Sequence, residues 1–156
     1  MDPFVAFKYL HIVAMFFAVA LALSSEIVLR RVATSGDVRA IRAIVPRVRP
    51  LGNIATVLFL SGFAFGIVAA LTGQINLLAP WLILSYVAFV SATLIGALVS
   101  DPWAKRLEDA AVASQDDAPS DALRSVIADP VARAGTWALM ALVAALVFFM
   151  VVKPFV

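Results

Sequence analysis

The chain has 156 residues, of which 63% are hydrophobic and only 14% are charged, with a formal net charge of +2. A soluble domain carries about a quarter charged residues, whereas here long apolar blocks indicate membrane-spanning helices. Because cysteine is absent, disulfides, thiol chemistry and cysteine-bound iron–sulfur clusters are excluded. The single histidine also excludes a histidine-rich metal cage within one chain. The length is that of a single membrane domain covering residues 1–156.

The first apolar run extends from Phe4 to Ser25 and carries the only histidine, His11. It predicts a helix over residues 4–31, on which His11 lies roughly 10 Å below one membrane surface at a rise of 1.5 Å per residue. We expect this segment to be retained rather than cleaved as a signal peptide, because acidic Asp2 comes first and ionisable Lys8 and His11 interrupt the apolar core.

An arginine-rich segment over residues 32–50 follows and is expected to form the first loop. Within it, residues 38–45 predict a short helix with an apolar face that lies along the membrane surface. We expect Pro46 and Pro50 to end this helix. The apolar face consists of Val38, Ile41 and Val45.

The second and third apolar segments predict helices over residues 51–72 and 79–100, joined by a short uncharged turn. Each carries small residues four apart, a spacing that allows another helix to approach closely. The simplest packing sets the two small-residue stripes against each other. These stripes include Gly62 and Gly66 in one helix and Ala92 and Gly96 in the other.

The polar segment 101–133 is expected to form the second long loop, with a flexible acidic stretch over residues 114–120. The fourth apolar segment predicts the last helix, over residues 134–152. Apolar residues at helical spacing predict a short helix early in the loop: Trp103, Leu107 and Ala111.

The basic residues predict the topology. Ten of the twelve Lys and Arg lie in or beside the two long loops, and the remaining two are Lys8 and Lys153. The positive-inside rule therefore places both loops in the cytoplasm and both termini outside. We predict an all-α protein with four transmembrane helices in an up-and-down bundle. The basic cluster is expected to contact anionic lipid, and a nucleic-acid partner is not expected because interleaved aromatics are missing.

His11 is the strongest candidate for a functional residue, because an ionisable group within hydrocarbon is costly. A neutral imidazole can bind haem iron through one nitrogen while the other donates a hydrogen bond. Five-coordinate haem needs only His11, whereas a sixth ligand requires Met140, Met150, Lys8 or His11 of a second subunit. The alternative is a histidine that hydrogen-bonds to a neighbouring helix and stabilises the bundle.

Glu26 has two interpretations. Arg30 lies four residues further on, so an ordinary helix-surface ion pair at the membrane boundary explains it. The other interpretation is a proton relay that ends at this boundary. Glu26 lies about 22 Å from His11 along the helix, too far for both to act directly on one small substrate.

The segment Phe7–Phe16, with Lys8, Leu10 and His11 at the opening of the first of four helices, resembles several bacterial membrane families. The whole chain looks most like an uncharacterised family of small bacterial integral membrane proteins, a domain of unknown function. It is also distantly similar to haem-binding membrane protoporphyrinogen oxidases and to copper-resistance membrane domains. The similarity to the oxidases implies haem binding at His11. The chain departs from these groups in having no lysine in the second or third helix and no further histidine.

Two classes of function follow. The leading hypothesis is a multi-pass protein of the bacterial inner membrane, oligomeric or part of a membrane complex, that binds haem b through His11 for electron transfer or porphyrin oxidation. The alternative is a non-catalytic accessory subunit or a small transporter. A carrier that couples transport to protons through His11 and Glu26 is a third possibility, which the lack of acidic residues in mid-helix disfavours.

Overall fold

The computed structural model describes residues 2–114 and 118–154, so the centre of the predicted acidic stretch, residues 115–117, lies outside the described residues. The described residues form helices and no strand. The elements are α1 (Pro3–Ser35), α2 (Val38–Thr72), α3 (Pro80–Ile95), a π-helical turn η1 (Gly96–Ser100), α4 (Asp101–Ala113), α5 (Asp121–Ile127) and α6 (Pro130–Val152).

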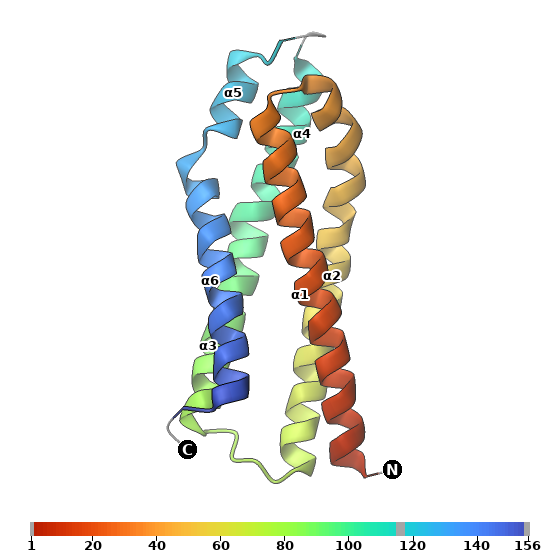
Figure 1. The fold of residues 1–156 in the computed structure, drawn as a ribbon, viewed down its shortest axis with the longest axis vertical. Coiled ribbons are helices and arrows are strands. Elements are labelled where there is room, and N and C mark those ends of the chain that lie inside the picture. Colours follow the sequence, from red (N-terminus) through yellow and green to blue (C-terminus); the bar gives the residue numbers. More distant parts are fainter. Residues whose placement is uncertain (1, 115–117, 155–156) are drawn as a thin grey trace.

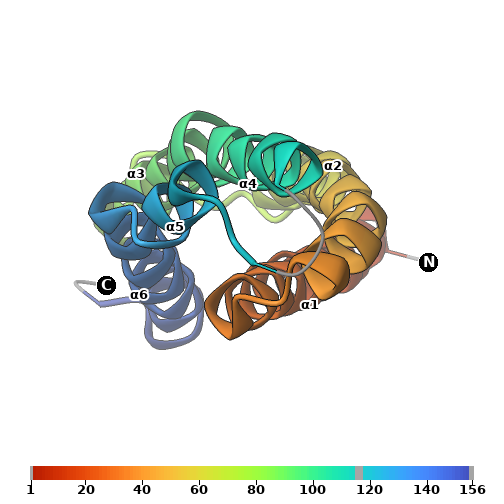
Figure 2. The ribbon, with the colours of Figure 1, turned by 90° about the horizontal axis from the view of Figure 1, so that it is seen from above.

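The helices form four long antiparallel rods: α1, α2, the continuous α3–η1–α4, and α5 followed by α6 (Figure 1). All four are long and apolar enough to cross a membrane, which confirms the predicted all-α class with four spans. Figure 2 shows the rods arranged around a common centre, with α1 beside α2 and α6 beside α3. Both termini lie at the same end (Figure 1). Which end faces outside stays a prediction.

The helices are longer than the apolar segments predict. Residues 32–50 and 101–133, expected to be loops, are largely helical. Pro46 and Pro50 lie inside α2 rather than at a helix end, and Pro102 stands in the first turn of α4, within the third rod. A transmembrane helix tolerates proline where neighbouring groups satisfy the freed carbonyls. The rods therefore extend beyond the apolar spans at the end opposite the termini.

The turn between α1 and α2 follows from two residues. Gly36 adopts a positive φ of 68°, a conformation that ends α1 at little steric cost. Asp37 then caps α2, because its side chain accepts the backbone N–H groups of Arg39 and Ala40. The chain reverses within these two residues, so α1 and α2 pack against each other along their length.

The apolar core is concentrated at the end opposite the termini, which we call the loop end. Ile41 and Val45, expected to face the membrane surface, are instead fully buried against α4 and α5. They lie there because α4 presents its own apolar face, as its spacing predicts. That face consists of Trp103, Leu107 and Ala111.

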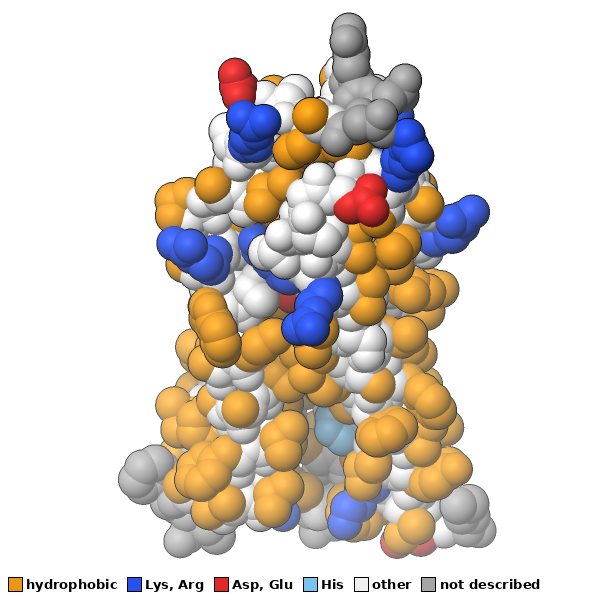
Figure 3. All heavy atoms as spheres, turned by 45° about the horizontal axis from the view of Figure 1, so that its top comes forward, with side chains coloured by type: hydrophobic (Ala, Val, Ile, Leu, Met, Phe, Trp, Pro, Cys, Tyr) orange, Lys and Arg blue, Asp and Glu red, His pale blue; other side chains and the backbone are white. Residues whose placement is uncertain are grey.

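Arginines connect the helices at the loop end. Arg42 of α2 donates through Nε to the carbonyl of Ala111, 2.8 Å away, at the C-terminus of α4. Arg49 pairs with Glu108 at 3.0 Å. Cations stabilise helix C-termini and their free carbonyls, so these side chains do more than set topology. The basic side chains gather on this part of the surface, above an apolar belt (Figure 3).

The small-residue stripes do not pack against each other, so this expectation is wrong. A Cβ on Gly62 would lie 2.8 Å from Sδ of Met15, and one on Gly66 would lie 2.8 Å from Nδ1 of His11, so this stripe faces α1. A Cβ on Gly96 would meet no atom within 4 Å. The stripe of α2 serves the contact with α1.

Aromatic rings bridge α2 and α3 instead of small residues. Phe63 stacks on Phe89 with 4.7 Å between ring centroids, and Phe59 meets Phe89 edge-on at 6.1 Å. Large side chains hold the two helices apart, whereas glycine brings α1 close to α2. The molecule thus consists of a pair α1–α2 and a pair α3–α6 with space between them in the half that contains the termini.

Candidate functional site

His11 lies at the contact between α1 and α2. Its Nδ1 is 2.7 Å from the backbone carbonyl oxygen of Gly62. In a helix the side chain of the residue four positions on covers such a carbonyl, and here that residue is Gly66. Because Gly66 has no side chain, the imidazole rests directly on the helix and reaches the carbonyl.

This hydrogen bond determines the tautomer of His11. A carbonyl oxygen only accepts, so Nδ1 must carry the proton and donate it. In the neutral ring Nε2 then holds the free lone pair. Metal-binding histidines commonly have this arrangement, in which one nitrogen donates to a backbone carbonyl and the other binds the metal.

A cavity of about 930 Å³ separates the two helix pairs. Its walls are mostly apolar and include His11, Met15, Phe59, Phe89 and Val143. The cavity is open at the surface, where α1 and α6 contact each other sparsely, and the histidine is visible within a hollow of that surface (Figure 3). A volume of this order suits a cofactor or other ligand of drug size.

A second cavity, of about 420 Å³, lies nearer the termini and is also lined by His11. Met15, Phe89 and Met150 line both cavities too. His11 therefore stands where the two cavities meet, so its ring is accessible to a molecule in either of them.

The structure narrows the set of side chains that could act as a second ligand to an iron bound at His11. Met150 of α6 lines the cavity opposite α1 together with His11, whereas Met140 lines neither cavity. Lys8 lines the second cavity, one helical turn from His11. Among the described residues, no cluster of three or more His, Cys, Asp or Glu side chains could hold a metal ion. Of the four residues that the sequence offers as iron ligands within one chain, His11 and Met150 line the main cavity, whereas Lys8 and Met140 do not.

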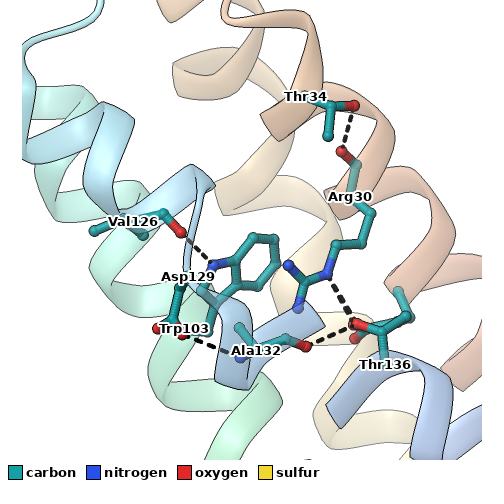
Figure 4. A network of polar contacts seen from close by, with 8 residues as sticks. Arg30, Thr34, Trp103, Val126, Asp129, Ala132 and Thr136 are labelled. Atoms are coloured by element: carbon teal, nitrogen blue, oxygen red, sulfur yellow. Dashed lines mark hydrogen bonds and ion pairs between the residues drawn. The ribbon is translucent and has the colours of Figure 1, made fainter. Parts of the chain in front are cut away.

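Glu26 lies at the loop end of the main cavity and is only 5% exposed. Its Oε1 is 3.4 Å from Nε of Arg30 and accepts the hydroxyl of Thr136 from α6. Arg30 Nε also lies 2.8 Å from the Thr136 hydroxyl oxygen, and its guanidinium stacks over Trp103 at 3.8 Å from the ring centroid (Figure 4). The predicted Glu26–Arg30 pair is present, but it is buried and joins three rods rather than lying on a helix surface.

Comparison with known proteins gives one match. The model of a protein family described as predicted integral membrane protein (DUF2269) matches residues 5–154. The chain belongs to this family. No curated protein and no solved structure matches the chain.

The sequence did not indicate the contacts that two residues of this DUF2269 protein make. Thr136 sits in a helix otherwise read as aliphatic and aromatic, yet it bonds to Glu26 across the bundle. Trp103 was expected on a helix face, and its stacking with Arg30 was not foreseen. A hydroxyl within an apolar span is a sequence signal, since such groups hydrogen-bond across helices. Nothing in the sequence indicates which helix supplies the partner.

Proposed function

We propose that this integral membrane protein binds haem b through Nε2 of His11 and uses it for electron transfer or porphyrin oxidation. The observation that carries the proposal is the 2.7 Å contact between Nδ1 and the Gly62 carbonyl. It orients the ring and leaves Nε2 as the lone-pair donor, which is the form that binds iron. His11 also lines both cavities, which a histidine serving only to join helices would not need.

The surroundings of His11 fit a flat apolar macrocycle. The main cavity is large and mostly apolar and is lined by Phe59 and Phe89, which meet edge-on. Phe63 stacks on Phe89 and lines the second cavity. Gly66 allows the imidazole to lie against α2. When bound, haem supplies a one-electron redox centre whose potential depends on its axial ligands and burial. The residues of the chain hold the iron, orient the ring and exclude water.

The test is the visible spectrum of protein purified in detergent from cells supplied with haem. We expect a Soret band in the wild type and its loss in His11→Ala. Tyr9→Ala is the matched control, since this ring of α1 is 61% exposed and lines neither cavity, and it should retain the band. A colourless wild-type protein that shows no spectral change with added haem would refute the proposal and favour an accessory or transport role.

Met150→Leu then distinguishes five- from six-coordinate iron. If Met150 is the second ligand, the variant changes the spin state and raises the affinity for carbon monoxide. An unchanged spectrum rules out Met150 as the second ligand.

A further inference from the structure

Two lysines flank the second cavity at the end where the termini lie. Lys8 of α1 and Lys153, which caps α6, both line this cavity together with His11. The ammonium of Lys8 lies 5.6 Å from the centroid of the Phe4 ring, and that of Lys153 lies 5.2 Å from the Trp81 ring. Contacts of this length over aromatic faces are attractive. Both charges are thus held at the edge of the cavity.

Within residues 2–114 and 118–154, neither lysine has an ion-pair partner. Asp2, at the same end of the molecule, accepts the backbone N–H of Phe4 instead. At the loop end, by contrast, Arg49 and Arg106 each pair with a carboxylate. Two cations beside one cavity repel each other, and an anion placed between them relieves that repulsion.

A third polar group belongs to the same cavity. The hydroxyl of Tyr86 is buried and has no hydrogen-bond partner among the described residues. A buried unsatisfied hydroxyl costs free energy, so a ligand oxygen within reach of it would be stabilised. The rest of the wall, including Trp81, Leu82 and Phe89, is apolar.

We propose that Lys8 and Lys153 bind the carboxylates of an anionic amphiphile whose apolar body extends to His11. The inference rests on the proposed function, and for haem the carboxylates are its two propionates. The lysines then decide which way round the molecule sits: its charged edge faces the end of the bundle with the termini, and its apolar edge faces the membrane interior. They position the ligand, and His11 holds the iron.

The test compares haem with haem dimethyl ester, in which both carboxylates are neutral. Purified wild type and the double variant Lys8→Gln/Lys153→Gln are titrated with each compound in a neutral detergent, and the Soret shift gives Kd. We expect the double variant to bind haem about tenfold more weakly, equivalent to about 1.4 kcal/mol, and to bind the ester as the wild type does. Lys105→Gln, on α4, is the matched control and should change neither Kd.

The double variant Lys8→Arg/Lys153→Arg keeps both charges and should restore haem binding, which separates the role of charge from an effect on folding. An equal loss for haem and ester, or no loss for haem, would overturn this inference and leave binding at His11 intact. If the wild type binds neither compound, the proposed function itself fails.

Discussion

The two ends of the bundle differ in how closely their helices pack. At the loop end, Trp103, Ile41 and Leu107 are fully buried in one continuous apolar core, and buried polar contacts link three rods. Between this core and the termini, the helix pairs separate around two cavities that share His11; the larger one begins at Glu26 and Arg49, beside the core. The core is filled by its own side chains, whereas the rest of the bundle has space for a ligand.

This contrast assigns His11 and Glu26 of α1 to different tasks. Glu26 lies where neighbouring helices supply Arg30 and Thr136, so its charge is compensated within the protein. His11 uses one ring nitrogen on the backbone of α2 and has no second partner among the described residues. We therefore expect Glu26 to stabilise the fold and His11 to be the residue available for binding.

The largest expected loss of stability comes from a substitution in the apolar core at the loop end. Trp103→Ala removes a fully buried ring, its stacking with Arg30 and the 2.9 Å hydrogen bond from its Nε1 to the carbonyl of Val126. We expect the free energy of unfolding to fall by about 4 kcal/mol, measured by SDS titration in mixed micelles with far-UV circular dichroism. Trp137→Ala, at a ring that is 69% exposed, should cost far less. Similar losses for both would contradict a specific core at this end.

A smaller loss is expected for Glu26→Ala. The change leaves Arg30 without its carboxylate, and we expect a cost of about 2–3 kcal/mol, below the range for fully buried pairs, because the Arg30 side chain as a whole keeps some access to solvent. The same SDS titration measures it. Asp121→Ala provides the control, since the Asp121 carboxylate is exposed in its pair with Arg124, and it should change stability by less than about 0.5 kcal/mol. A Glu26 variant as stable as wild type would contradict a stabilising role for this residue.

The smallest expected effects on stability come from substitutions at two glycines. Gly66→Ala places a Cβ 2.8 Å from Nδ1 of His11, so the ring or the helix must shift, at an expected cost of about 1–2 kcal/mol. Haem binding should weaken as the Gly62 hydrogen bond is displaced. Gly96→Ala meets no neighbour and should be neutral or slightly stabilising, because alanine favours helix. If both substitutions behave alike in thermal stability, the close approach of His11 to α2 has no consequence for the fold.

The four spans were predictable because the length of an apolar run is a local property. The face of Trp103, Leu107 and Ala111 was predictable for the same reason. The partner that covers such a face is not encoded in the neighbouring residues. The face of Ile41 and Val45 is compatible with contact to lipid or to α4, and only the packing of the whole bundle distinguishes the two. Pro46 and Pro50 misled because proline ends isolated helices, whereas packing at the loop end keeps α2 continuous.

The candidate site was predictable only in its central residue. A lone histidine in an apolar run attracts notice because of its cost, but its partner is a backbone carbonyl, which every residue has. The Gly62–Gly66 spacing correctly predicted a close helix contact, but the expected partner, the third helix, was wrong. That α1 approaches, and that it brings His11, follows from the short turn at Gly36 and Asp37.

The most direct test is nitrogen-15 NMR of the ligand-free protein labelled at histidine, in lipid bilayers. Because the chain has one histidine, the spectrum contains a single pair of ring nitrogens. The account predicts that Nδ1 is protonated and hydrogen-bonded, that Nε2 is unprotonated, and that Gly66→Ala abolishes this preference. A ring protonated at Nε2 alone, or exchanging freely between tautomers, would contradict the proposed orientation of His11.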